Sequence, residues 1–268
     1  MSKIINLTDF AALIKSKSKI GIGGFDLHRK PIELVLQICE SEAEDLELFG
    51  ISLALEADLL IGSGKVGRII SSYTGLENFG QCYFFRDACE REEIESVELS
   101  TYATILALQA GALGIEYIPS KTMLHSDMAK SNNLIRIINS PFSDNVYAAI
   151  KSYNPDISLI HVGEADRKGN AYIYHPPATK VDELLAKASK TSIISTEKLV
   201  DKIENPTISG IYISHILHLP GGSAQTSHYP LCDVDSKTME LYSKGSKEKN
   251  LSFCKEVIKN AIERRRKN

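Results

Sequence analysis

Residues 19–39 read Lys-Ile-Gly-Ile-Gly-Gly-Phe-Asp-Leu-His-Arg-Lys-Pro-Ile-Glu-Leu-Val-Leu-Gln-Ile-Cys, and their pattern indicates the fold class. Residues 19–22 are apolar enough for a short β-strand, and they run into a glycine turn at Gly23 and Gly24. Residues 31–39 carry apolar side chains at helical spacing, and Pro31 suits the first turn of a helix. The order strand, glycine turn, helix is the opening of a βαβ unit.

The same alternation continues along the chain. Residues 157–162, Ile-Ser-Leu-Ile-His-Val, form a nearly continuous apolar run, typical of a strand buried on both faces of a parallel sheet. Further strands are predicted at residues 46–52, 94–99, 192–195 and 211–219, and helices at 101–113 (capped by Ser100), 179–190 and twice near the C-terminus. Thr8 is predicted to cap a short first helix.

No repeat, low-complexity tract or linker composition divides the chain. We therefore predict an α/β protein with an open, mostly parallel, twisted sheet flanked by helices. We also predict that residues 1–268 form a single domain.

Composition and charge exclude several classes of function. The net charge of −3 offers no basic surface for nucleic acid or anionic lipid. No apolar run reaches the roughly 18 residues of a membrane helix, and Asp9 interrupts the first segment before a secretion signal could form. The five cysteines are scattered and lack the paired spacing of a zinc site. We predict a cytoplasmic protein without a nucleic-acid or membrane partner, a metal site or a tightly bound cofactor.

Polar and glycine residues follow several predicted strands. Because ligands of open parallel sheets bind beyond the carboxyl ends of the strands, we expect these groups to share one rim of the sheet. The groups are Gly23-Gly24-Phe25, Glu98, Glu164-Ala165-Asp166, Thr196-Glu197 and Pro220-Gly221-Gly222-Ser223.

The glycine turn does not match a nucleotide-binding motif. Asp26 replaces the third glycine of the dinucleotide fingerprint, and the chain contains no Gly-x-Ser-x-Gly nucleophile elbow. Gly23 and Gly24 instead offer backbone N–H groups that a ligand can approach closely, as an oxyanion hole requires. The alternative is that the two glycines only permit a tight turn.

The histidines are spread singly along the sequence. His161 lies in an apolar run, which favours a hydrogen-bonded core histidine over a catalytic one. His215 and His218 are three residues apart in a predicted strand, so they face opposite sides of the sheet and are poor joint metal ligands.

The segment 20–31 resembles the Gly-Gly-Phe coenzyme A-binding motif, with its trailing Arg-Lys-Pro, of the first (alpha-type) subunit of family I coenzyme A transferases. Within that family the resemblance is strongest to the first subunits of glutaconate CoA-transferases. It continues in order over about nine-tenths of the chain, through segments 60–66, 71–75, 85–86, 94–98, 112–119, 140–142, 155–156, 160–161, 165–170 and 219–223.

The resemblance implies an open α/β fold and an enzyme that moves coenzyme A between an acyl-CoA and a small carboxylic acid, for example a dicarboxylate such as glutaconate. In this family a glutamate attacks the thioester in a ping-pong reaction. That glutamate lies in a Ser-Glu-Asn-Gly motif of a second, beta-type subunit, and this motif is absent here. The chain is therefore expected to be active only with its partner, in a heterotetramer or larger assembly, with coenzyme A as substrate.

Several residues acquire expected roles from the resemblance. Gly23 and Gly24 would donate to the thioester oxygen, and Glu98 would act as a general base. Arg29 would pair with a substrate carboxylate. The alternatives are a surface ion pair for Arg29 and a capping or structural carboxylate for Glu98. The further residues expected to contact substrate or coenzyme A are Phe25, His28, Gly221 and Gly222.

Two other functions remain open on the sequence. Relatives with this subunit plan include ring-opening hydrolases and decarboxylases of CoA thioesters. A non-catalytic binding or scaffold subunit is the second alternative, and it would tolerate the loss of Arg29 and Glu98. Both residues are present, which favours an enzyme.

Overall fold

The computed structural model describes residues 2–174 and 180–267. Its main sheet has eight strands, seven of which lie in the order β11-β10-β8-β1-β2-β3-β4 and are all parallel. The eighth, β9 (Ala171–Tyr172), pairs antiparallel with β8. The predicted open, mostly parallel sheet is therefore confirmed. The seven strands are β1 Lys19–Ile22, β2 Leu46–Leu53, β3 Val66–Thr74, β4 Glu95–Glu98, β8 Ile157–Asp166, β10 Thr191–Val200 and β11 His215–His218.

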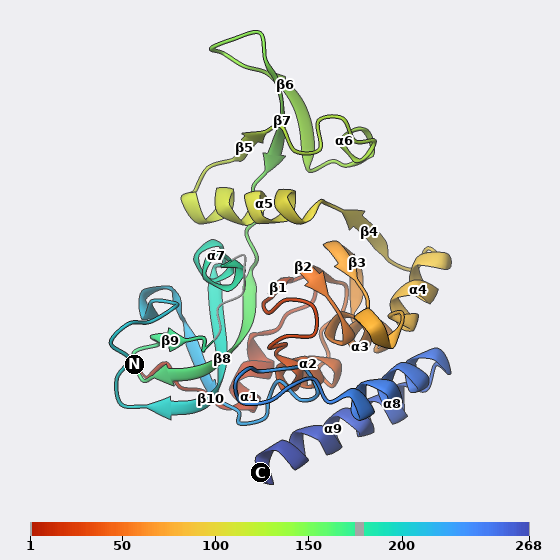
Figure 1. Ribbon diagram of the computed structural model, residues 1–268, viewed down its shortest axis with the longest axis vertical. Coiled ribbons are helices and arrows are strands. Elements are labelled where there is room, and N and C mark those ends of the chain that lie inside the picture. Colours follow the sequence, from red (N-terminus) through yellow and green to blue (C-terminus); the bar gives the residue numbers. More distant parts are fainter. Residues whose placement is uncertain (1, 175–179, 268) are drawn as a thin grey trace.

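Helices cover both faces of this sheet (Figure 1). On one face, one apolar core includes buried side chains of α1 Leu7–Leu13, α2 Ile32–Cys39, α3 Leu55–Gly62, α4 Tyr83–Glu90, α8 Ser236–Lys247 and α9 Leu251–Lys267. On the other face, a second core includes those of α5 Thr101–Leu113 and α7 Val181–Ala188. Burial of parallel strands on both faces explains the nearly continuous apolar run at residues 157–162 of β8. Within the described residues, no helix is both long and apolar enough to span a membrane.

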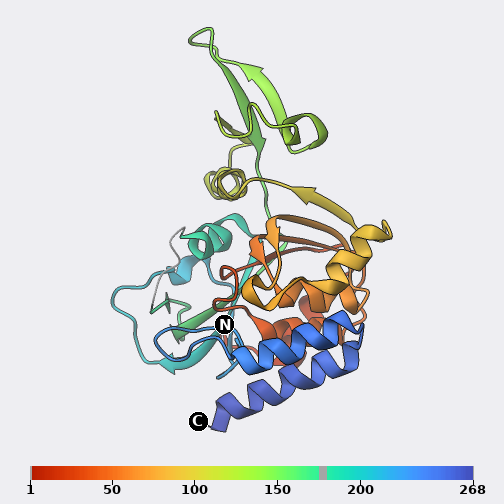
Figure 2. The same cartoon turned by 45° about the vertical axis from the view of Figure 1, so that its right-hand side comes forward.

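A small antiparallel sheet extends from the body beyond α5 (Figures 1 and 2). It is formed by β5 Tyr117–Ser120, β6 Ile135–Asn139 and β7 Val146–Lys151, in the order β5-β7-β6, with the short helix α6 Met128–Ser131 beside it. We call residues 117–151 the projecting sheet. Its strands were not predicted from the sequence, because they are short and half-exposed and show no clear apolar alternation.

Element boundaries differ from the prediction in several places. The first helix is capped by Asn6 rather than Thr8, because the Asn6 side chain accepts the Asp9 N–H. β10 continues beyond Ser195 because its pairing with β8 extends to Val200. The predicted strand at 211–219 is a 3-10 turn at Gly210–Tyr212 followed by β11. The predicted helix start at Thr179 lies outside the described residues, whereas α5 and its Ser100 cap agree with the prediction.

The order of the strands reverses at β1. From β1 the chain proceeds through β2 and β3 to β4 on one side, whereas β8, β10 and β11 lie on the other side. In open α/β sheets the crevice at such a switch point, beyond the carboxyl ends of the strands, is where ligands bind. Gly23 and Gly24 follow β1 at this point.

Candidate functional site

The backbone N–H groups of Gly23 and Gly24 both have acceptors within the chain. The Gly23 N–H donates to the Leu159 carbonyl at 2.9 Å, and the Gly24 N–H donates to Asp182 Oδ1 at 2.8 Å. Gly24 has a φ of +76°, and a side chain there would collide with the carbonyl oxygen of His28. The turn thus requires glycine for its own conformation, and in this structure the predicted oxyanion donors are engaged.

Arg29 is buried, with only 4% of its surface exposed. Its NH2 lies 2.7 Å from Asp182 Oδ2, and its NH1 donates to the His161 carbonyl at 3.1 Å. Because Asp182 also accepts the Gly24 N–H, Arg29 supports the glycine turn through a shared carboxylate. The alternative of a surface ion pair is wrong because the pair is buried. The geometry favours a positioning role and does not support direct pairing with a substrate carboxylate.

Phe25 and His28 close the glycine turn. Each donates its backbone N–H to the carbonyl of the other, at 3.2 and 2.8 Å. Phe25 is half-buried, and the exposed His28 ring contacts the Ser227 hydroxyl through Nδ1. Contact of either side chain with coenzyme A or substrate stays a prediction.

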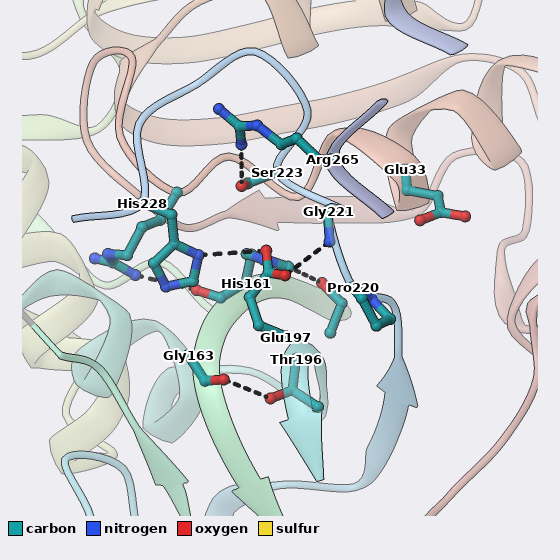
Figure 3. Close-up of polar contacts among 12 residues, drawn as sticks. Glu33, His161, Gly163, Thr196, Glu197, Pro220, Gly221, Ser223, His228 and Arg265 are labelled. Atoms are coloured by element: carbon teal, nitrogen blue, oxygen red, sulfur yellow. Dashed lines mark hydrogen bonds and ion pairs between the residues drawn. The ribbon is translucent and has the colours of Figure 1, made fainter. Parts of the chain in front are cut away.

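Glu197, on β10, is the centre of a second group of residues (Figure 3). Its Oε1 lies 2.9 Å from His161 Nε2 and 3.5 Å from His228 Nδ1, and its Oε2 accepts the Gly221 N–H at 2.7 Å. Both histidine side chains are fully buried, whereas that of Glu197 is 14% exposed. One carboxylate of β10 therefore joins the middle of β8 to the loop that follows β11.

The surroundings shift the pKa values of Glu197 and His228. Burial raises the pKa of Glu197, but the contacts with His161 and His228 and the Gly221 N–H outweigh it, so the net pKa lies well below its usual value. Burial lowers the pKa of His228 to about 4, which keeps its ring neutral at neutral pH. An ionised carboxylate therefore faces a neutral imidazole.

Gly221 and Gly222 have defined backbone roles. The Gly221 N–H is held by Glu197, as described above, and Gly221 has a φ of +71°. The Gly222 N–H donates to the Leu219 carbonyl, and its own carbonyl accepts the Glu33 N–H at the start of α2, both at 2.9 Å. Both glycines are buried. These contacts fasten the loop after β11 to its neighbours, and binding of coenzyme A by either glycine stays a prediction.

Glu98 lies apart from this group, in an open cleft of about 750 Å³ beside the edge strand β4. Arg86, Cys89, Ser96 and Asn132 also line the cleft. The Glu98 side chain is exposed, and among residues 2–174 and 180–267 no hydrogen bond or ion pair engages its carboxylate. The capping role at α5 belongs to Ser100, so the capping alternative for Glu98 is wrong.

The structure brings together only part of the predicted rim. Gly23, Gly24, Glu197 and Gly221 converge on the side of β1 occupied by β8, β10 and β11. Glu98 ends β4, and β2 and β3 lie between β4 and β1. Three strand spacings of about 4.8 Å each place Glu98 roughly 14 Å across the sheet from the glycine turn.

Three central residues of the site have no role predicted from the sequence. Asp182 and His228 carry no local motif, and each reaches the site only through long-range folding. Glu197 is predicted at the rim, but without a role. His161 is a buried, hydrogen-bonded histidine, as expected, with Nδ1 2.8 Å from Ser195 Oγ. The feature that identifies this group is that two buried histidines, His161 and His228, face the carboxylate of Glu197.

Those two histidines and Glu197 could also hold a metal ion. One potential ligand atom from each of His161, Glu197 and His228 lies within 4.8 Å of the other two. Two imidazole nitrogens with one carboxylate oxygen are a donor set suited to divalent transition metals.

Comparison with known proteins identifies the family. Residues 4–219 match the coenzyme A transferase family. The chain is 27% identical to the A subunit of 3-oxoadipate CoA-transferase from Pseudomonas knackmussii, over 90% of this chain and 88% of the relative. It is 28% identical to the A subunit of glutaconate CoA-transferase from Acidaminococcus fermentans, over 96% and 88%.

Two further likenesses extend this comparison. A crystal structure of the Acidaminococcus fermentans glutaconate CoA-transferase resembles the chain with a TM-score of 0.89 at 26% identity, covering 97% of this chain and 89% of that one. The IpdA subunit of the cholesterol ring-cleaving hydrolase from Rhodococcus jostii is 25% identical over 91% of this chain and 87% of the relative. The chain belongs to the coenzyme A transferase family.

Proposed function

We propose that this chain is the first of two kinds of subunit in a heteromeric, cytoplasmic CoA-transferase that exchanges coenzyme A between an acyl-CoA and a small carboxylic acid. The observation that carries the proposal is the Gly23-Gly24-Phe25 turn at the switch point of a parallel sheet, in a chain of this family. The two relatives named as A subunits support a partner subunit. The five cysteines are free thiols, in keeping with the cytoplasm.

The proposed reaction takes place in two halves, with a glutamate of the partner as nucleophile. Its carboxylate attacks the acyl carbonyl and displaces coenzyme A as a thiolate, leaving an acyl anhydride. The thiolate then attacks the glutamyl carbonyl, which releases the first acid and leaves a glutamyl-CoA thioester. The acceptor carboxylate reverses these steps. In this scheme the present chain positions coenzyme A and the acyl group.

The substrates we propose are dicarboxylic acyl groups. Glutaconate and 3-oxoadipate, named in the two relatives, are both dicarboxylates. The second carboxylate of such a substrate requires a cation. Arg29 is buried in its ion pair with Asp182, whereas Arg86 lines the open cleft beside Glu98, and its ion pair with Glu90 is exposed to solvent. We therefore assign recognition of the free carboxylate to Arg86.

Reconstitution tests the proposal. The chain would be purified alone and together with a second subunit that carries a Ser-Glu-Asn-Gly motif, and glutaconyl-CoA:acetate exchange would be measured. We expect exchange only from the pair, and borohydride should trap a glutamyl-CoA thioester on the partner. Exchange by this chain alone would contradict the proposal, as would an active pair without a trappable thioester.

A water-dependent reaction is the second candidate function. It is favoured by the Glu98 carboxylate, which is exposed in the cleft and unengaged in the described part of the chain. Such a group can act as a general base on water, and the relative from Rhodococcus jostii is named as a hydrolase.

The variant Glu98→Gln separates the two candidates, because glutamine retains the shape of the side chain but is not a base. In a transferase we expect a modest loss of turnover and a thioester that borohydride still traps. In a hydrolase, removing the general base should lower turnover about 10²–10⁴-fold. A collapse of that size, with no trappable thioester in the unaltered complex, would replace the transferase with the hydrolase.

A further inference from the structure

His228 is buried without adequate polar partners. It has no exposed surface, and neither ring nitrogen forms a hydrogen bond within residues 2–174 and 180–267. Its Nδ1 nevertheless points at Glu197 Oε1 from 3.5 Å (Figure 3). A buried polar group without a partner costs about 1–3 kcal/mol, and such groups in folded proteins call for an explanation, such as an unseen ion.

From this geometry we propose that His161, Glu197 and His228 form a binding site for a divalent transition-metal ion. The ligand atoms would be Nε2 of His161, Oε1 of Glu197 and Nδ1 of His228. This inference goes beyond the proposed transferase function and does not depend on it.

Two of the three distances between these atoms suit a shared ion, and all three atoms lie within 4.8 Å of one another. Zinc binds imidazole nitrogen and carboxylate oxygen at about 2.0–2.2 Å, so neighbouring ligand atoms around it lie about 3.0–3.5 Å apart. Glu197 Oε1 lies 2.9 Å from His161 Nε2 and 3.5 Å from His228 Nδ1. A hydrogen bond between His161 and Glu197 explains the first distance equally well, but it leaves His228 without a partner.

Outer contacts already orient two of the three ligands. His161 Nδ1 lies 2.8 Å from the hydroxyl of the buried Ser195, which directs Nε2 towards Glu197. The Gly221 N–H occupies Glu197 Oε2 and leaves Oε1 facing the histidines. Metal sites are built in this way, because second contacts fix the ring orientation and the tautomer of ligating histidines.

The charges near the site influence which further ligand would complete the coordination of the ion. Arg29 forms its ion pair with Asp182, and Arg265 bonds to Ser223 Oγ and to the Thr226 carbonyl. Three protein ligands leave at least one coordination position on the ion. Because Asp182 balances the charge of Arg29, the charge of Arg265 is the one that favours an anion, such as hydroxide or a carboxylate, at that position.

Fixing His161 would also stabilise the glycine turn. The His161 carbonyl accepts from Arg29 NH1, and Arg29 supports Asp182, which holds the Gly24 N–H. An ion at His161 would therefore hold the middle of β8 against the turn at the switch point.

Cobalt(II) titration tests the site, because the visible spectrum of Co²⁺ changes when imidazole nitrogens and a carboxylate replace water as its ligands. The 268-residue chain would be stripped with a chelator, titrated with Co²⁺ and then with Zn²⁺, and its metal content measured by mass spectrometry. We expect one saturable site per chain, with Zn²⁺ displacing Co²⁺. No binding, or binding that leaves the visible spectrum of Co²⁺ unchanged from that of the hydrated ion, would overturn the proposal.

Three variants test whether the ion binds at this group. His228→Gln should weaken Co²⁺ binding by more than tenfold. Ser195→Ala removes only an orienting contact, and losses of this kind cost about 10–100-fold in affinity. His125→Gln, at an exposed histidine outside the group, should leave the affinity unchanged. Circular dichroism would confirm folding of each variant. Wild-type affinity in His228→Gln, or a loss in His125→Gln, would exclude this group as the site.

Discussion

At the scale of single residues, the glycine turn is held by buried charge. Asp182 bonds to the Gly24 N–H through one oxygen and to Arg29 through the other, and its side chain is 1% exposed. Buried ion pairs contribute little net stability, yet removing one partner leaves an uncompensated buried charge. The conformation of Gly23 and Gly24 therefore depends on a residue that is distant in the sequence.

Asp182→Asn tests this dependence. Asparagine can still accept the Gly24 N–H, but it leaves the Arg29 guanidinium without a counter-charge. We expect a loss of about 3–5 kcal/mol in the free energy of unfolding, measured by urea denaturation. Glu183→Gln is the matched control, since it breaks only the partly exposed pair with Lys187, and it should cost less than about 1 kcal/mol. Equal effects of the two variants would show that the buried pair does not hold the turn.

Arg86→Gln tests the proposed recognition of substrate. A hydrogen bond to a charged group contributes about 1.5–3 kcal/mol, so we expect KM for a dicarboxylic acyl-CoA to rise roughly 10–100-fold in the reconstituted enzyme. KM for a monocarboxylic acyl-CoA should change little. Arg91→Gln, which removes an exposed arginine just after α4, serves as the control. A similar rise for both substrate classes would argue against recognition of the second carboxylate by Arg86.

At the scale of helices and strands, the sequence predicted the elements whose pattern lies in neighbouring residues. The strand, glycine turn and helix of residues 19–39 follow from apolar spacing and from Pro31, and α5 follows from its Ser100 cap. The end of β10 could not be predicted. Thr196 and Glu197 are polar and indicate a strand end, but pairing with β8 and contact with His161 hold them within the strand.

The candidate site was predictable only in part for the same reason. Gly23 and Gly24 were placed at the rim correctly, because a strand followed by glycines is a local pattern. The burial of Arg29 and the approach of His228 to Glu197 depend on contacts between segments that are distant in the sequence. The spacing of residues along the sequence does not reveal such contacts.

Helix α8 is attached to α3 through a buried carboxylate. Asp58 Oδ2 accepts from the Tyr242 hydroxyl at 3.0 Å and from the Ser246 hydroxyl at 2.6 Å, and Oδ1 accepts the Phe85 N–H at 3.0 Å. Burial raises the pKa of Asp58 to about 6, although these hydrogen bonds lower it. The native protein therefore retains a proton on Asp58 in a pH range where the unfolded chain has lost it.

This shift predicts a pH dependence of stability. Because the native state binds the proton more tightly, the free energy of unfolding should fall as pH rises from about 4 to about 6, by roughly 3 kcal/mol in total. Asp58→Asn removes this contribution and can keep the hydrogen bonds, since both hydroxyls can turn to accept. The quantity to compare is the free energy of unfolding of the wild type minus that of Asp58→Asn. As pH rises from about 4 to about 7, this difference should fall by roughly 3 kcal/mol. A difference that stays flat with pH would contradict the raised pKa, and Glu92→Gln controls for surface charge.

At the scale of the whole molecule, the projecting sheet raises the question of how many units the chain contains. The projecting sheet extends beyond α5 in both views (Figures 1 and 2). The chain nevertheless enters and leaves it at adjacent points, because the Ser152 N–H donates to the Glu116 carbonyl at 2.8 Å. Its buried residues Ile135, Ala148 and Ile150 belong to the same apolar core as α5 and the face of the main sheet that α5 covers. A continuous core favours the single domain predicted from the sequence.

A single domain should unfold in one step. The chain contains no tryptophan, so Tyr147→Trp would place one fluorescent probe at a half-buried position in β7. Far-UV circular dichroism reports mainly on the helices, most of which lie in the body. Because burial in a shared core couples the two parts, we expect urea transitions with the same midpoint and slope by both probes. A fluorescence transition at lower urea, with the dichroism unchanged there, would show that the projecting sheet unfolds as a unit of its own.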